Sequence, residues 1–205
     1  MEVLNTALLE SFQNLEKEAI PEERKKVLWP LVKYIHLKLK AQKLIHLHFI
    51  CTHNSRRSQL AQVLAQAIGH HFDVSLSTYS GGTEATAFNE QAVQALGNMG
   101  FHIEQKGTSN PHYLCSYSEA QPPVITFSKK FDDPTNPTRD FAAIMTCSEA
   151  DQNCPFIPGA EQRIPIRYED PKLYDGTTEA AHQYANTARQ IAREMLFVFS
   201  QVVAS

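Results

Sequence analysis

The sequence contains no apolar run of roughly 18 residues, the length that a membrane-spanning helix requires. Its start, MEVLNTALLE, lacks the basic segment that opens a secretory signal peptide. Neither sign of charge dominates, because 19 Lys and Arg residues accompany 22 Asp and Glu residues. No global field therefore attracts nucleic acid or an anionic membrane. We expect a cytoplasmic protein that binds neither of them.

Cysteine is also scarce, since the chain has only four in 205 residues. Four cysteines are too few for a disulfide scaffold at this length, so catalytic or redox use is the better expectation. They lack the paired spacing of zinc ligands. His46 and His48 share a strand face by spacing, but two histidines alone are a weak metal signal, and a packed or edge position is the better interpretation. We predict no metal site.

The apolar content of 42% suits a single globular domain with a sizeable core, with room for a small appendage. From residue 44 onward, short apolar runs alternate with helical stretches, which predicts an α/β fold with a parallel sheet flanked by helices. The expected strands are 44–50, 73–79, 123–127, 141–146 and 163–167, and the expected helices are 57–68, 88–99 and 178–203. The stretch 106–140, rich in Pro, Ser, Asp and Asn, is interpreted as long connections.

Residues 1–41 precede this pattern and are typical of two helices. The second helix is expected to begin near Pro21, and Pro30 should kink or break it. We therefore expect an N-terminal helical extension over 1–41 and a main domain over 42–205. The extension could cap a site, form an oligomer contact or be purely structural, and the sequence leaves these alternatives open.

The stretch HFICTHNSRRSQLAQVLAQAIG, residues 48–69, joins a buried strand to a helix through a polar loop. Its apolar run ends at Ile50, and apolar residues recur at helical spacing from Leu60 to the stop signal at Gly69. Loop N–H groups and the helix N-terminus can therefore converge on one anion. A nucleotide-binding P-loop is excluded here, because the Gly-Lys-Ser/Thr element is missing.

The loop combines a nucleophile with groups that bind an oxyanion. A thiol is a strong nucleophile only as the thiolate, and the helix N-terminus together with Arg57 would favour that form of Cys51. Arg57 can clamp two oxygens of a tetrahedral anion held by loop N–H groups. Ser58 can donate to the sulfur, and Asn54 can hold the loop's shape. The candidate oxyanion-binding residues are Thr52, His53, Asn54, Ser55, Arg56, Arg57 and Ser58. The alternative is a small buried cysteine followed by solvated arginines.

The loop sequence CTHNSRRS resembles the active-site loop of low-molecular-weight tyrosine phosphatases and of the thioredoxin-coupled arsenate reductases that share their fold. The resemblance continues through YSGGTEATAFNEQAVQALGNMGFHI to the C-terminal helix and covers about residues 43–200. It implies a phosphatase-like catalytic domain over 42–205, with the extension 1–41 outside it. One departure is His53, where these families commonly carry Gly.

The segment MTCSEADQNCPFIPG separates the two families, because it sets Cys147 and Cys154 seven positions apart. A phosphatase needs one cysteine, whereas a thiol-linked reductase needs further cysteines to resolve an oxidised or arsenylated Cys51. This arrangement, a cysteine followed after six residues by Cys-Pro, resembles the redox segment of the reductases. The alternative is that both are incidental thiols. Cys115 has no motif around it and receives no role.

The segment RYEDPKLYDG supplies an acid, because both families carry Asp-Pro at this place. Asp170 is therefore the expected general acid for the departing oxygen. The alternative is a surface aspartate that starts a turn before Pro171. Asp133 has a similar local sequence but precedes the strand at 141–146, whereas the family acid follows it. Tyr174 resembles an aromatic that phosphatases place beside the site.

The resemblance implies an arsenate reductase that needs no organic cofactor. Cys51 would attack arsenate held by the loop and Arg57, with Asp170 protonating the leaving oxygen. Cys147 would then attack Cys51 and release arsenite, and Cys154 would leave a disulfide with Cys147 for a thioredoxin-like reductant. One alternative is a tyrosine phosphatase that hydrolyses aryl phosphate monoesters through a phosphocysteine. The other is a noncatalytic oxyanion-binding module.

Overall fold

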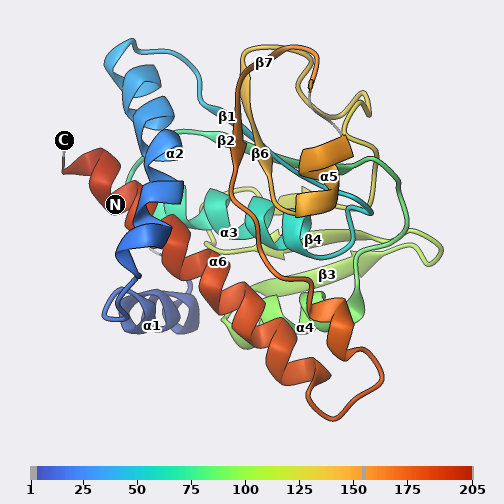
Figure 1. Cartoon of the computed structure of the whole chain (residues 1–205). Coiled ribbons are helices and arrows are strands. Elements are labelled where there is room, and N and C mark those ends of the chain that lie inside the picture. Colours follow the sequence, from blue (N-terminus) through green and yellow to red (C-terminus); the bar gives the residue numbers. More distant parts are fainter. Residues whose placement is uncertain (1–3, 154–155, 205) are drawn as a thin grey trace.

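The structure is a computed structural model that describes residues 4–153 and 156–204. Figure 1 shows its helices and strands in chain order. They are α1 Thr6–Leu15, α2 Glu22–Lys40, β1 His46–Cys51, α3 Arg57–His71, β2 Ser77–Gly82, α4 Glu90–Asn98, β3 His102–Lys106, β4 His112–Ser116, β5 Val124–Thr126, β6 Phe141–Met145, α5 Ser148–Asn153, β7 Ala160–Pro165, the 3₁₀ helix η1 Pro171–Tyr174 and α6 Ala180–Val203. Among the described residues, no helix is both long and apolar enough to cross a membrane.

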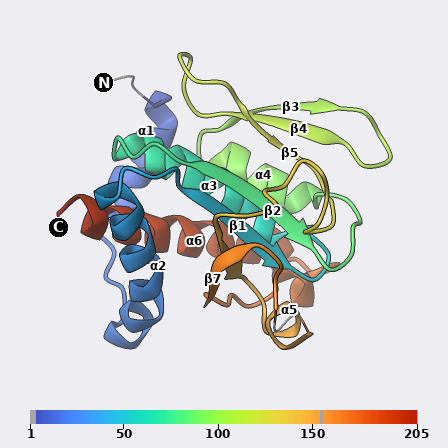
Figure 2. The ribbon, with the colours of Figure 1, turned by 90° about the horizontal axis from the view of Figure 1, so that it is seen from above.

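A parallel sheet in the order β2-β1-β6-β7 confirms the predicted α/β class. Side chains of β1 alternate between its two faces, as a strand requires. Leu47 and Phe49 belong to the main core with residues of α3 and α6. Ile50 belongs to a smaller cluster on the other face, together with residues of β6 and α5. Figure 2 shows α3 and α6 running beneath and beside these strands. β1 is therefore buried on both faces, as its apolar run predicted.

A second sheet, antiparallel in the order β3-β4-β5, corrects two expectations. The stretch 106–140 is not all connection, because it contains the end of β3 and all of β4 and β5. The strand expected at 123–127 belongs to this second sheet, not to the parallel one. The β3 and β4 strands were hard to recognise because they are short and β3 is largely exposed, so neither sequence carries an apolar run.

The strand expected at 73–79 also differs, since β2 runs from Ser77 to Gly82. The preceding helix α3 continues to His71, and Asp73 then turns the chain with φ 56°. Left-handed backbone of this kind is tolerated by aspartate better than by most side chains. The turn therefore takes the residues that were assigned to the start of the strand.

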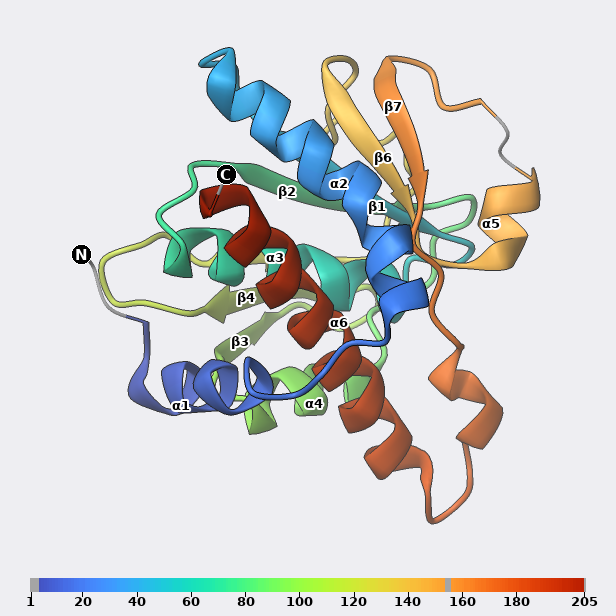
Figure 3. The same ribbon diagram turned by 60° about the vertical axis from the view of Figure 1, so that its left-hand side comes forward.

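The two N-terminal helices lie against α6, as Figure 3 shows. Leu8 and Phe12 of α1 and Leu28 of α2 are fully buried in the core that α6 shares. The predicted break at Pro30 is wrong, because α2 is continuous from Glu22 to Lys40. Leu28 and Leu31 flank the proline and are fully buried, so tertiary packing holds both halves in the helical conformation.

Candidate active site

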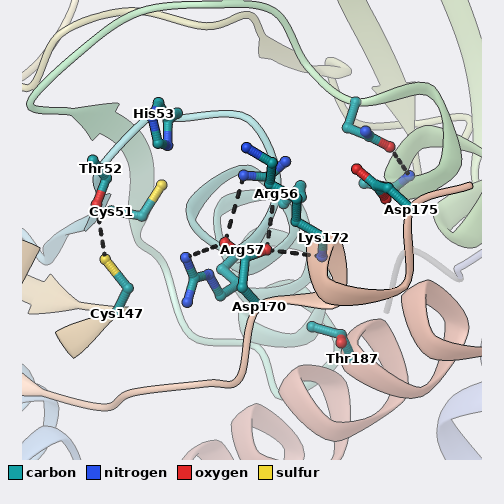
Figure 4. Close-up of polar contacts among 12 residues, drawn as sticks. Cys51, Thr52, His53, Arg56, Arg57, Cys147, Asp170, Lys172, Asp175 and Thr187 are labelled. Carbon is teal, nitrogen blue, oxygen red and sulfur yellow. Dashed lines mark hydrogen bonds and ion pairs between the residues drawn. The ribbon is translucent and has the colours of Figure 1, made fainter. Parts of the chain in front are cut away.

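The candidate loop lies where three parallel strands end. Figure 4 shows the side chains that meet there. β1 ends at Cys51, and α3 begins at Arg57 after the intervening loop. Cys147 follows the end of β6, and Asp170 follows the end of β7. The carboxyl ends of parallel strands meet at one edge of a sheet, which is where α/β proteins bind their ligands. The topology thereby brings together Arg57 and Asp170, which are 113 positions apart in the sequence.

The Cys51 side chain is 3% exposed and accepts a hydrogen bond from the Asn54 N–H at 3.2 Å. Its sulfur is also 3.0 Å from the Ser58 hydroxyl oxygen. The Asn54 side-chain amide donates to that hydroxyl at 2.8 Å, and its carbonyl accepts the Lys129 N–H at 2.9 Å. Asn54 itself has φ 45°, a left-handed conformation that asparagine tolerates. The loop is therefore curled around the sulfur and held in that shape by a buried amide.

The remaining loop residues connect to neighbouring segments. The His53 carbonyl accepts the Ser128 hydroxyl at 3.1 Å, and its ring is 3.6 Å from the Glu84 carboxylate. The Ser55 carbonyl accepts the N–H of Asn89, the N-cap residue of α4, at 2.9 Å. The bulkier residue at position 53 thus directs its ring to the rim of the loop, where Figure 4 shows it apart from Cys51.

Gly82 at the end of β2 is a residue that sequence analysis assigned no role. A Cβ at this position would lie 2.6 Å from the Thr52 carbonyl oxygen and 2.7 Å from the Asn54 nitrogen. Real Cβ atoms do not approach backbone so closely. Gly82 therefore allows β2 to pack directly against the loop. The two adjacent glycines in the sequence could have indicated such a close approach of backbone.

Arg57 is bound by the acid segment. Its Nη2 is 2.6 Å from the Asp170 carboxylate, and its Nη1 donates to the Tyr168 carbonyl at 3.0 Å. Its Nε is buried and has no hydrogen-bond partner among the described residues. Arg56 also pairs with Asp170, with Nε 3.0 Å from the carboxylate. The structure therefore brings Asp170 to both arginines.

Asp133 has a different environment. Its carboxylate accepts the Thr135 N–H at 2.9 Å and caps a local turn. The side-chain hydrogen bond from Thr135 lowers the pKa of Asp133, while partial burial acts in the opposite direction. The Asp133 carboxylate thus bonds a residue of its own turn, Thr135, and not the loop at Cys51.

Cys147 is 2% exposed and lies next to the loop. Its sulfur is 3.5 Å from the Thr52 hydroxyl oxygen, which donates to the Glu149 carboxylate at 3.0 Å. The Ala150 N–H lies 3.4 Å from the same sulfur. Glu149 was not predicted, and its position two residues after Cys147 was the only signal. Cys154 lies outside the described residues.

Cys115 and His48 are buried, packed residues. Burial raises the pKa of the Cys115 thiol to about 12, which keeps it protonated and unreactive. Burial, followed by the charge of Lys129, lowers the pKa of His48 to about 3. The His48 ring lies 5.5 Å from that of Phe141, and neither ring nitrogen has a partner among the described residues. Across 4–153 and 156–204, no group of three or more His, Cys, Asp or Glu could hold a metal ion.

No family model matches the sequence, but curated proteins of known name do. The chain is 30% identical to arsenate reductase 2 of Staphylococcus epidermidis over 126 residues, which are 61% of this chain and 77% of that protein. It is 27% identical to the arsenate reductase of Bacillus licheniformis over 155 residues, which are 76% of this chain and 94% of that protein.

Solved structures define the class of fold. A low-molecular-weight phosphotyrosine phosphatase from Vibrio cholerae O395 matches with a TM-score of 0.53 and 14% identity, over 78% of this chain and 97% of that one. An arsenate reductase in the phosphate binding state matches with a TM-score of 0.51 and 18% identity, over 77% and 98%. The fold is thus that of the low-molecular-weight phosphatases. With the identity to the reductase of S. epidermidis, the chain belongs to the family of enzymes that comprises arsenate reductases and low-molecular-weight tyrosine phosphatases.

Proposed function

We propose that the protein is an arsenate reductase that uses Cys51 as nucleophile and a relay of two further cysteines. The observation that carries this choice within the family is the position of Cys147. Its sulfur lies 3.5 Å from the hydroxyl of Thr52, the residue that directly follows Cys51. A phosphatase has no use for a second buried thiol here, whereas a reductase needs one. The names of the similar proteins, arsenate reductases among them, support the same choice.

The first step forms a bond between Cys51 and arsenic. Arsenate binds to the loop N–H groups and to Arg57, and similarity to an arsenate reductase in the phosphate binding state supports an oxyanion at this place. The Cys51 thiolate attacks arsenic while one As–O bond breaks, and that oxygen leaves as water after protonation by Asp170. Asp170 is paired with Arg57 at 2.6 Å. It must therefore release Arg57 to the oxyanion and carry a proton before this step.

The next steps move two electrons from thiols to arsenic. The Cys147 thiolate attacks the Cys51 sulfur, the S–As bond breaks, and its electron pair reduces As(V) to As(III), which leaves as arsenite. Cys154 then attacks Cys147 and frees Cys51. The product disulfide between Cys147 and Cys154 needs a dithiol reductant of the thioredoxin type to complete the cycle.

A second candidate is hydrolysis of aryl phosphates by the same Cys51, Arg57 and Asp170. The observation in its favour is Tyr174, which is 38% exposed in η1 and lines a cavity together with Asp170. An exposed ring beside the acid can pack against the aryl group of a substrate. A noncatalytic oxyanion-binding module is the weaker alternative, because it would not require the acid.

The deciding experiment compares two assays on the same preparation. One measures arsenate reduction with thioredoxin, thioredoxin reductase and NADPH, and the other measures hydrolysis of an aryl phosphate. We expect repeated turnover in the first assay, because thioredoxin reduces the disulfide formed in each cycle, with one NADPH oxidised for each arsenate reduced. Absence of reductant-dependent turnover, together with robust hydrolysis of the aryl phosphate, would assign the protein to the phosphatases instead.

A further inference from the structure

The helix α2 lies outside the sequence resemblance, yet one of its side chains reaches into the main domain. Arg24, in the first turns of α2, donates from Nε and Nη2 to the two oxygens of Glu194 on α6, both at 2.7 Å. The Glu194 side chain is only 1% exposed, and Gln190 donates to it at 3.1 Å. A buried carboxylate of this kind is tolerated only when its hydrogen bonds are satisfied. Arg24 therefore occupies a fixed position and is not a surface charge.

The same guanidinium lies on Tyr168, a residue of the acid segment. The Arg24 Cζ atom is 5.0 Å from the centre of the Tyr168 ring, within the range of a cation–π contact. Burial, and then the charge of Glu194, raises the pKa of Tyr168 well above its usual value, so its ring is neutral. Figure 3 shows α2 beside the strand β7 that leads into this segment. Arg24 thus joins α6 to the chain that carries Asp170.

The backbone of Tyr168 makes two contacts with the candidate site. Its carbonyl accepts Nη1 of Arg57 at 3.0 Å, and its N–H donates to the Thr146 carbonyl, next to Cys147, at 3.0 Å. With Nη1 committed to this carbonyl, the Nε and Nη2 edge of Arg57 faces away from it. Nε is buried without a partner among the described residues, and Nη2 holds Asp170. That edge has the spacing of donors that binds two oxygens of an oxyanion.

We propose that Arg24 is a positioning residue for the oxyanion site, and that the N-terminal helix α2 therefore contributes to oxyanion binding. Arg24 fixes the Tyr168 ring, and the carbonyl of the same residue orients Arg57 so that its Nε and Nη2 edge meets the oxyanion. The inference rests on the proposed oxyanion role of Arg57, but not on arsenate reduction. Preorganised groups bind more tightly because no ordering cost remains to be met at binding.

The test measures phosphate binding without catalysis. Iodoacetamide alkylates Cys51 in the full-length protein, phosphate should protect it, and the phosphate dependence of the alkylation rate, followed by mass spectrometry, gives the Kd. Arg24→Met should weaken this Kd on the order of tenfold, the scale on which misplaced supporting groups weaken a site. Arg24→Lys should weaken it less. The control is Lys26→Ala on the same helix, where the Lys26 and Glu23 side chains are 68% and 84% exposed, and it should leave the Kd unchanged.

Two backgrounds separate positioning from general destabilisation. In Asp170→Asn, where the competing carboxylate is absent, Arg24→Met should cause the same loss. In the Arg57→Ala background, Arg24→Met should not weaken the Kd further, because the guanidinium that Arg24 positions is absent. An unchanged or tighter Kd for Arg24→Met, or an equal loss in the Arg57→Ala background, would overturn the inference. If Arg24→Met does not fold, Arg24→Lys and Glu194→Gln carry the same prediction at smaller size. A wild-type protein that phosphate does not protect would instead refute the proposed site itself.

Discussion

Asn54 shows how much of the candidate site depends on single side chains. Its left-handed backbone, with φ 45°, turns the loop so that its N–H meets the Cys51 sulfur at 3.2 Å. Its side-chain amide bonds Ser58 and the backbone of Lys129. Asn54 therefore fixes the shape of the loop around the Cys51 sulfur before any ligand arrives, and the proposed chemistry would depend on such preorganisation.

The first prediction concerns Cys51. Replacing Cys51 with Ser should abolish both arsenate reduction and aryl-phosphate hydrolysis, because an alcohol in this loop is not ionised at neutral pH and is a weak nucleophile. The fold should be retained, since the change is small. Circular dichroism and the two assays measure this directly. Turnover comparable to wild type in either assay would mean that the nucleophile lies elsewhere.

The second prediction uses the two aspartates that precede prolines. Asp170→Asn should slow the step that expels oxygen by roughly 10²-fold to 10⁴-fold, the usual contribution of a general acid. Phosphate binding should not weaken, because the neutral amide competes less well for Arg57 than the carboxylate now 2.6 Å from it. Asp133→Asn is the matched control, since Asp133 caps its own turn. Damage confined to the Asp133 variant would show that the acid was assigned to the wrong segment.

At the scale of elements, the sequence predicted the strand that is buried on both faces and missed a strand that is largely exposed. The β1 strand, the loop and α3 were predictable, because an apolar run, a polar loop and a helical period follow one another without interruption. The β3 and β4 strands were missed, since β3 is largely exposed and only two residues of β4 are buried. Contacts such as Tyr168 with Arg57 join residues 111 positions apart and leave no local pattern.

The third prediction belongs to the segment that contains α5. Replacing either Cys147 or Cys154 with Ser should stop multiple-turnover arsenate reduction but leave aryl-phosphate hydrolysis nearly intact, because water completes that reaction. The variants should stall differently. Without Cys154, one arsenite is released and a disulfide between Cys51 and Cys147 remains, whereas without Cys147 the arsenylated Cys51 remains. Mass spectrometry of arsenate-treated protein distinguishes them, and reduced thiols in both variants would refute the relay.

At the scale of the whole molecule, the extension and the main domain share one core. Leu28 and Ile35 of α2 are fully buried in the same cluster as Ile191 and Phe199 of α6. Burying such side chains contributes about 1.5–3 kcal/mol each. The extension is therefore integral to the stability of the chain, which places Arg24 in a rigid setting and makes single substitutions better probes of its role than truncation.

The last prediction concerns the stability of the whole chain in acid. Burial lowers the pKa of His48 to about 3, whereas in the unfolded chain it should be near ~6.5. Between these two values the unfolded state binds a proton that the folded state does not. The free energy of unfolding should therefore fall as the pH drops below about 6.5, with a slope from this group of up to ~1.4 kcal/mol per pH unit, and this effect should be absent above that pH.

His48→Leu removes the buried imidazole and should flatten this dependence, as urea unfolding at pH 7.0, 6.0 and 5.0 would measure. The matched control is His102→Gln, because His102 is exposed on β3. It should keep the acid slope of the wild type. If His48→Leu loses stability between pH 7 and pH 5 as steeply as the wild type does, the buried imidazole does not govern the acid sensitivity of the fold.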